Sequence, residues 1–147
     1  MKRLAAGLFS LVMLTLPVTL KAEQSRDFGD YTIHYNAFTT DLLTPEIARA
    51  YDIRRSSNRV MLNISILKKV MGTSSQPVSA RVEATATNLN SQLRKLHIRE
   101  LNEQGAIYYI AELKVDHKET LKFDLSITPK GADDTYNFTF TQQFFVD

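Results

Sequence analysis

Cysteine is absent from the 147-residue chain, glycine occurs only five times and histidine three times. Without cysteine, no disulfide, thiolate metal ligand or lipid-bearing thiol is available, so stability must come from a hydrophobic core. The few glycines form no glycine-rich loop of the kind that binds phosphate. His34, His97 and His117 stand apart, without the HxxxH or HExxH spacing of zinc sites. The sequence therefore predicts no metal, no cofactor and no recognisable catalytic motif.

The first 22 residues have the organisation of a secretory signal peptide. Two basic residues precede an apolar run over residues 4–20, and a small residue, Ala22, follows shortly after it. The run is interrupted by glycine, serine and proline, and it is shorter than the roughly 20 apolar residues that a membrane-spanning helix needs. We expect cleavage after Ala22, which leaves residues 23–147 as a single soluble domain in the periplasm, without a stable membrane anchor.

The charge of the chain changes when this segment is removed. Residues 1–22 contain three of the 18 basic side chains and none of the 16 acidic ones, so the net charge falls from +2 to −1. A chain with this balance has no excess of positive charge to attract a polyanion. We therefore expect no nucleic-acid binding.

Apolar and polar residues alternate along most of the chain from residue 30 onward, which is the pattern of β-strands with one buried face. The pattern predicts an all-β fold, an antiparallel immunoglobulin-like β-sandwich of about seven strands. The later strands look like a meander, and a loss of phase near Gln142 suggests a bulge. The expected strands cover residues 31–36, 59–70, 78–88, 94–102, 106–115, 120–128 and 135–146.

A long connection, residues 39–58, separates the first two expected strands. Thr44 and Pro45 are of the residue types found at a helix N-cap and first turn, and Glu46 adds a favourable early negative charge. These residues predict one short helix within the connection. A connection of about 20 residues is long for a sandwich, and loops of this kind often carry function.

Basic and imidazole side chains near this connection are candidate binding groups. Arg54, Arg55 and Arg59 form the densest basic cluster of the chain, and guanidinium groups can hold a carboxylate or a phosphate. A solvated, salt-bridged loop is the alternative interpretation. His34 lies on the polar face of the first expected strand, as a structural or surface side chain or as part of the rim of a binding site.

Four segments of the chain carry a likeness to a known family: FGDYTIHYNAF, LTPEIARAYDIRRS, GAIYYIAEL and QFFVD. Together they resemble a family of exported bacterial proteins, domain of unknown function family 4426 (DUF4426), over residues 28–147. The resemblance implies a small periplasmic sandwich domain and assigns no activity. It also implies a shared site or structural element around the long connection. The candidate partner-binding residues are therefore His34, Asn36, Glu46, Tyr51, Arg54, Arg55 and Arg59.

Three functions are compatible with the sequence. The first, which we favour, is a non-enzymatic binding or accessory module that contacts an envelope protein, peptide or other envelope component through the first strand and residues 39–58. The second is a hydrolase with His34 as base and Asp41 or Glu46 as its orienting carboxylate. The third is a small-ligand carrier, although aromatic residues of a sandwich usually fill its core. The aromatic residues that would line its cavity are Tyr31, Tyr35, Phe138 and Phe140.

Overall fold

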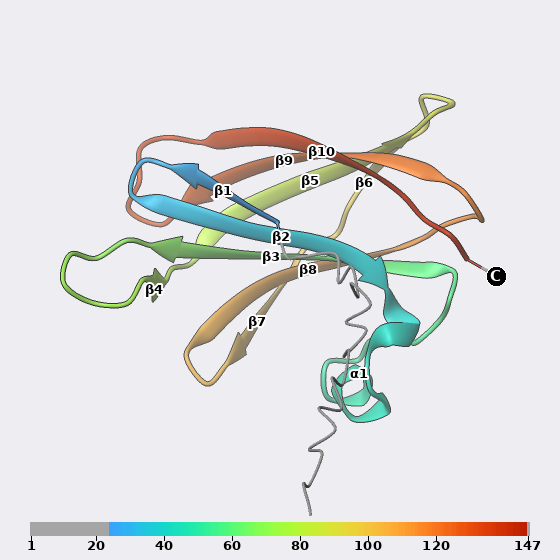
Figure 1. Ribbon diagram of the computed structural model, residues 1–147, viewed down its shortest axis with the longest axis horizontal. Coiled ribbons are helices and arrows are strands. Elements are labelled where there is room, and N and C mark those ends of the chain that lie inside the picture. The colour runs from blue at the N-terminus through green and yellow to red at the C-terminus, as the bar shows by residue number, and fades with distance from the viewer. Residues whose placement is uncertain (1–23, 147) are drawn as a thin grey trace, which may run out of the picture.

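Two antiparallel sheets pack face to face and bury the apolar rows of their strands between them (Figure 1). This computed structural model describes residues 24–146. It confirms the predicted all-β sandwich with one short helix. The predicted signal peptide, residues 1–22, and its cleavage site lie outside the described residues and stay a prediction.

The larger sheet has six strands and the smaller sheet has four. In spatial order, the larger sheet contains β1 (Gln24–Phe28), β2 (Tyr31–Thr39), β3 (Arg59–Lys68), β8 (Ala106–Lys114) and β7 (Arg99–Glu103), with β4 (Gln76–Pro77) paired to β3. The smaller sheet contains β10 (Tyr136–Gln143), β9 (Thr120–Pro129), β5 (Ala80–Asn88) and β6 (Leu93–Lys95). The connection between β2 and β3 contains a 3-10 turn, η1 (Thr40–Leu42), and the helix α1 (Pro45–Ala50).

Aromatic rings from both sheets fill the space between them. Tyr35 of β2 packs against Phe138 and Phe140 of β10, with ring centroids 5.0 and 4.7 Å apart, and Phe140 stacks on the fully buried Phe123 at 4.8 Å. Tyr31 is buried in the same cluster. These rings therefore form the core and do not line a ligand cavity, which contradicts the carrier hypothesis in the form that used them.

Three details of the predicted strand arrangement are wrong. The expected strand over residues 94–102 is divided into β6 and β7, because the chain crosses from the smaller sheet to the larger one at the buried Leu96. The chain crosses back to the smaller sheet between β8 and β9, so these two strands belong to different sheets and do not complete a meander. The expected bulge at Gln142 is also absent, since β10 pairs with β9 in unbroken register to Gln143. Gln142 instead turns inward and its side-chain amide donates to the carbonyl of Ala37, 3.0 Å away.

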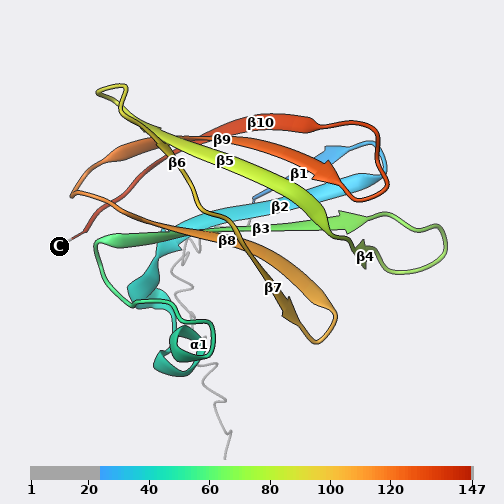
Figure 2. The ribbon, with the colours of Figure 1, turned by 180° about the vertical axis from the view of Figure 1, so that it is seen from behind.

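The connection between β2 and β3 forms a third layer on the larger sheet. Figures 1 and 2 both show α1 on the side of this sheet that faces away from the smaller sheet, which we call the outer face. A second, smaller hydrophobic cluster holds the connection there: Ala48 and Ile53 pack against Met61 of β3 and Ile110 of β8. The outer face of the larger sheet is thus partly covered, and the connection borders whatever site lies on it.

Candidate binding groove

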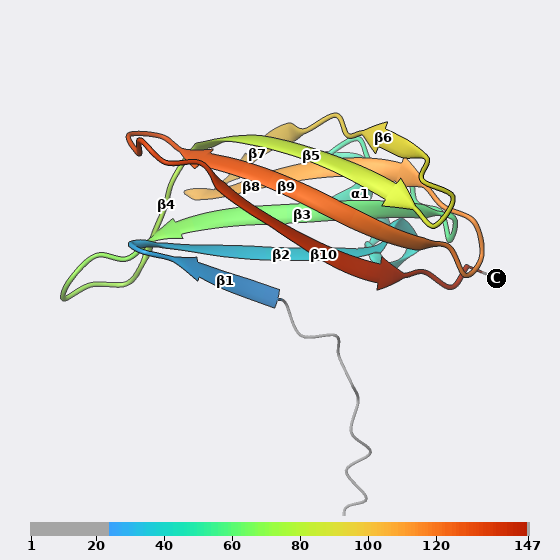
Figure 3. The same ribbon diagram turned by 90° about the horizontal axis from the view of Figure 1, so that it is seen from above.

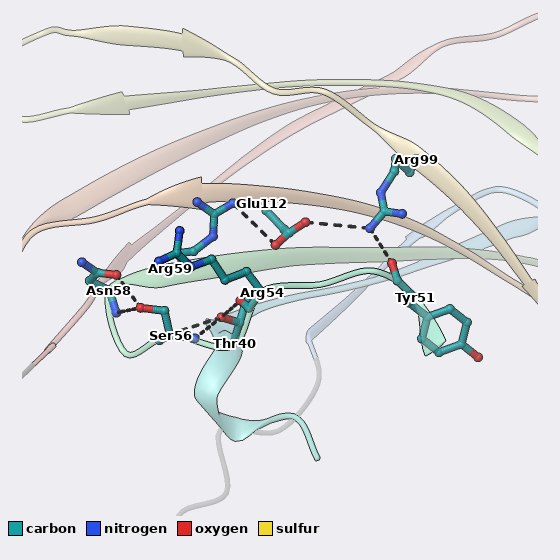
Figure 4. Close-up of polar contacts among 8 residues, drawn as sticks. All are labelled: Thr40, Tyr51, Arg54, Ser56, Asn58, Arg59, Arg99 and Glu112. Carbon is teal, nitrogen blue, oxygen red and sulfur yellow. Dashed lines mark hydrogen bonds and ion pairs between the residues drawn. The ribbon is translucent and has the colours of Figure 1, made fainter. Parts of the chain in front are cut away.

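The two ends of the connection are joined by one buried threonine. The hydroxyl of Thr40, which is fully buried, donates to the carbonyl of Arg54 at 2.7 Å and accepts from the backbone N–H of Ser56 at 2.8 Å (Figure 4). Thr40 directly follows β2, and Ser56 lies just before β3. Thr40 and Arg54 are 14 positions apart in the chain, and the segment between them is therefore closed into a loop whose base is fixed.

Two further interactions shape the loop. The Arg55 guanidinium donates from Nε to the carbonyl of Leu43 at 2.7 Å and from Nη2 to the carbonyl of Asp41 at 3.1 Å. The N-cap predicted at Thr44 is present, because its hydroxyl accepts from the N–H of Ile47 at 3.3 Å. Arg55, predicted as a binding group, thus holds the beginning of the connection against its end.

An apolar groove of about 260 Å³ lies between the connection and the outer face of the larger sheet. The connection forms one wall with Leu43, Ile47, Tyr51 and Ile53. The sheet forms the rest with Phe38, Met61, Asn63, Leu101, Tyr108 and Ile110. At its rim, Ile47 and Tyr108 are 45% and 37% exposed, which is high for apolar and aromatic side chains that face one hollow. The groove is therefore an apolar surface that the chain leaves half covered.

Polar atoms without a hydrogen bond cluster on this same outer face. Within residues 24–146, the buried side-chain atoms that lack a hydrogen bond belong to β2, β3 and β8. They are Asn36 Oδ1, Arg59 Nε, Asn63 Oδ1 and Glu112 Oε1. Asn36 and Asn63 face each other across β2 and β3, and Asn63 lines the groove. Buried polar groups of this kind each cost about 1–3 kcal/mol unless a partner satisfies them.

Glu112 is the centre of the charge network beside the groove. Its carboxylate lies 3.6 Å from Arg59 and 3.8 Å from Arg99, and only 18% of its side chain is exposed (Figure 4). Both distances exceed a good hydrogen bond, so the interaction is mainly between charges. Glu112 therefore compensates two guanidinium groups, one on β3 and one on β7, and fixes them on the outer face.

Tyr51 links the connection to β7 at the far end of the groove. Arg99 donates to the carbonyl of Tyr51 at 2.9 Å (Figure 4), and the Tyr51 hydroxyl donates to the carboxylate of Glu103. The hydrogen bond to Glu103 raises the pKa of Tyr51 above its usual value. Tyr51 thus joins the two walls of the groove through both its backbone and its side chain.

The structure brings some of the predicted site residues together and separates others. Asn36, Tyr51 and Arg59 lie at or beside the groove, whereas the side chains of Glu46 and Arg54 are exposed on the connection. His34 lies on β2 beside β1, opposite Ser25. The pKa of nearby Asp27 is lowered mainly by the Thr32 hydrogen bond and then by Lys69, with His34 the smallest contributor.

The catalytic pair suggested for His34 stays a prediction. His34 is five residues before the end of β2, which places it roughly 17 Å from that end at the rise of a strand. Asp41 and Glu46 both lie beyond the end of β2.

Several groove residues were not singled out from the sequence, among them Met61 and Ile110, which are buried on the outer face. A signal for them exists. The segment AIYYIA, residues 106–111, is apolar or aromatic at both parities, the pattern of a strand that is covered on both faces. Met61 similarly interrupts the alternation of β3, between Val60 and Leu62.

Residues 25–147 match the family model described as "Domain of unknown function (DUF4426)". The chain belongs to the DUF4426 family. Among solved structures, a DUF4426 family protein from Pseudomonas aeruginosa PAO1 is similar over 87% of this chain and 98% of its own, with 32% identity and a TM-score of 0.74. No functionally curated protein matches the chain.

Two structures of FetP from uropathogenic Escherichia coli strain F11 share the fold of this DUF4426 protein. One, from FetP expressed in the periplasm, is 9% identical and the other, a copper-bound variant, is 12% identical; both have a TM-score of 0.59. They cover 85% and 86% of this chain, and 95% and 97% of their own. At this identity the likeness concerns the fold alone.

Within residues 24–146, no helix has the length and apolarity to cross a bilayer. The same part of the chain contains no group of three or more histidine, aspartate or glutamate side chains arranged to hold a metal ion.

Proposed function

We propose that this DUF4426 protein is a non-enzymatic binding module of the periplasm that takes an apolar anchor of a protein or peptide partner into the groove beside the connection. The observation that carries the proposal is the groove itself, with Ile47 and Tyr108 half exposed at its rim. The signal-peptide pattern of residues 1–22 supports the location. The chemistry and size of the groove support the kind of partner.

The size of the groove favours a side chain over a whole ligand. Pockets that enclose a small molecule usually measure roughly 300–1,000 Å³ and bury most of it. At about 260 Å³, and open along its rim, this groove suits one or two apolar side chains of a larger partner. Anchors of this type supply most of the energy in many protein interfaces. Asn63 offers the same partner an oxygen that accepts a hydrogen bond.

Copper binding is not part of this proposal. Copper is bound by a FetP variant whose likeness to this chain is one of fold. The histidines of this chain lie apart, with His34 on β2, His97 between β6 and β7, and His117 between β8 and β9. Such a donor set does not form a ligand cluster in residues 24–146.

Site-specific photocrosslinking in cells tests the proposal. A benzophenone amino acid at position 108 replaces a tyrosine of similar shape at the rim, and the same amino acid at position 89 replaces Leu89, which is 82% exposed in a loop between β5 and β6. We expect a discrete crosslinked protein from position 108 and not from position 89.

Two variants, each with one further substitution besides the crosslinker at position 108, make the test specific to the groove. Ile47→Glu places a charge in the groove and should abolish the crosslink from position 108, whereas Met71→Glu, at a residue that is 99% exposed elsewhere, should preserve it. Equal crosslinking in both backgrounds would contradict the proposed groove. Crosslinking to a small envelope molecule in place of a protein would favour a carrier.

A further inference from the structure

One edge of the larger sheet is open and has a sequence that is complementary to itself. β7 pairs with β8 on one side and, among residues 24–146, with no strand on the other. Glu100 and Asn102 are exposed along it. On the opposite side of the sandwich, β1 and β10 run close together (Figure 3), and Arg26 of β1 donates to the carbonyl of Thr139 of β10 at 3.2 Å. β1 and β10, the edge strands on that side, therefore contact each other, whereas the open edge of β7 can still pair with another strand.

The turn that follows β7 fixes which backbone groups face outward. Gln104 and Gly105 both have positive φ, 47° and 88°, and form a two-residue turn between the paired residues Glu103 and Ala106. In such a hairpin the residues that flank the turn exchange hydrogen bonds, and the pattern then alternates along the strand. Residues 99, 101 and 103 therefore direct their N–H and C=O groups to β8. Glu100 and Asn102 direct theirs to the open edge.

We propose that two copies of the chain associate through β7, antiparallel and centred on Leu101, and so join their larger sheets into one. In this register Glu100 of each copy pairs with Asn102 of the other, and both have backbone groups that point outward. The two pairs would form about four backbone hydrogen bonds. Leu101 meets Leu101 at the two-fold axis, as a two-fold symmetric interface requires.

The side chains support this register over its neighbours. On the outer face, where Arg99 and Glu103 both contact Tyr51, each Arg99 comes to lie opposite Glu103 of the second copy. No two like charges face each other. A shift by two residues toward the start of β7 would instead place Glu100 opposite Glu100, which is unfavourable. The charges of β7 thus favour the register centred on Leu101 over the one centred on Glu100.

The proposed dimer does not depend on the proposed binding function, but it has a consequence for the binding groove. Because the two-fold axis is perpendicular to the joined sheet, both outer faces lie on the same side of it. Leu101 lines the groove of its own copy, so the two grooves would open next to each other. β7 has five residues, roughly 17 Å of strand, and the small contact predicts a weak dimer that depends on concentration.

Sedimentation equilibrium of the purified protein from about 10 μM to about 1 mM tests the dimer. We expect a reversible monomer–dimer equilibrium. Asn102→Glu places a glutamate opposite Glu100 twice per dimer and should weaken association by about threefold to thirtyfold, whereas Asn102→Lys should strengthen it by a similar factor. Thr141→Glu, which adds the same charge to the exposed face of β10, should leave the equilibrium unchanged.

The opposite signs expected for the two variants at one exposed position keep the test independent of any loss of folding. A monomer at every concentration would overturn the inference. So would a dimer whose dissociation constant moves in the same direction in Asn102→Glu and Asn102→Lys, because such a dimer would use another surface.

Discussion

Replacing Thr40 with valine tests whether the connection is held in place by one hydroxyl group. Valine has nearly the shape of threonine, so Thr40→Val keeps the packing of this fully buried side chain and removes its hydrogen bonds. The carbonyl of Arg54 and the N–H of Ser56 then lose partners at 2.7 and 2.8 Å. Both hydrogen bonds are part-buried at the base of the connection, so water can replace the hydroxyl only in part.

The expected cost follows from these two groups. A buried polar group that loses its partner destabilises a protein by about 1–3 kcal/mol. Two such groups predict a fall of up to about 2–6 kcal/mol in the free energy of unfolding, and a smaller fall where water replaces the hydroxyl. Urea denaturation followed by circular dichroism measures this change, and hydrogen exchange of the Ser56 amide shows whether the effect is local.

Thr141→Val is the matched control, since Thr141 is exposed on β10 and its hydroxyl makes no hydrogen bond within residues 24–146. It should change the unfolding free energy by less than about 0.5 kcal/mol. If Thr40→Val lost no more than the control, the idea that this hydroxyl holds the base of the connection would be refuted. The connection would then depend on Arg55 and its apolar contacts.

Two other predictions concern the polar contacts around the groove. Glu112→Gln removes the charge between Arg59 and Arg99 and should lower the unfolding free energy by about 1–3 kcal/mol in urea, while Glu83→Gln, at an exposed position on β5, should have little effect. The pKa of Tyr51 should lie above its usual value in a carbon-13 NMR titration of the tyrosine rings and fall in Glu103→Gln. Because a raised pKa favours the neutral phenol, this contact stabilises the fold at neutral pH and is lost as the pH rises through the pKa of Tyr51. An unchanged Tyr51 pKa in Glu103→Gln would exclude the contact.

Period-two alternation predicted the strands that have one buried face. In β9, for example, every second residue from Leu121 to Ile127 is buried and the residues between them are not, so the sequence carries the pattern directly. β1 had no such pattern, because it is a polar segment whose residues are mostly exposed and which is held mainly by pairing with β2. The switch at Leu96 was equally invisible, since alternation identifies faces and not neighbouring strands.

The candidate site was predicted in part, for an identifiable reason. The length of the connection and its helix signals identified the wall that contains Tyr51. The opposite wall comes from β2, β3, β7 and β8, and the residues on β7 and β8 lie far from the connection in the chain. A search for alternation also misses a strand whose second face is covered, because apolar residues then occur at both parities. Arg55 is the opposite case, a residue that the sequence singled out and whose contacts lie within its own loop. A guanidinium cluster predicts binding groups, but here Arg55 donates to backbone carbonyls of its own loop.

The connection and the sandwich are held by different interactions, and this separates the site from the fold. The sandwich has one large core between its sheets, whereas the connection rests on a cluster centred on four buried residues, with Thr40 and Arg55 at its base. Segments with few apolar contacts open at a lower free energy than a core. The wall of the groove formed by the connection can therefore adjust to an anchor without disturbing the sheets. Its other wall, on β2, β3, β7 and β8, belongs to the larger sheet and fixes where the proposed anchor must lie.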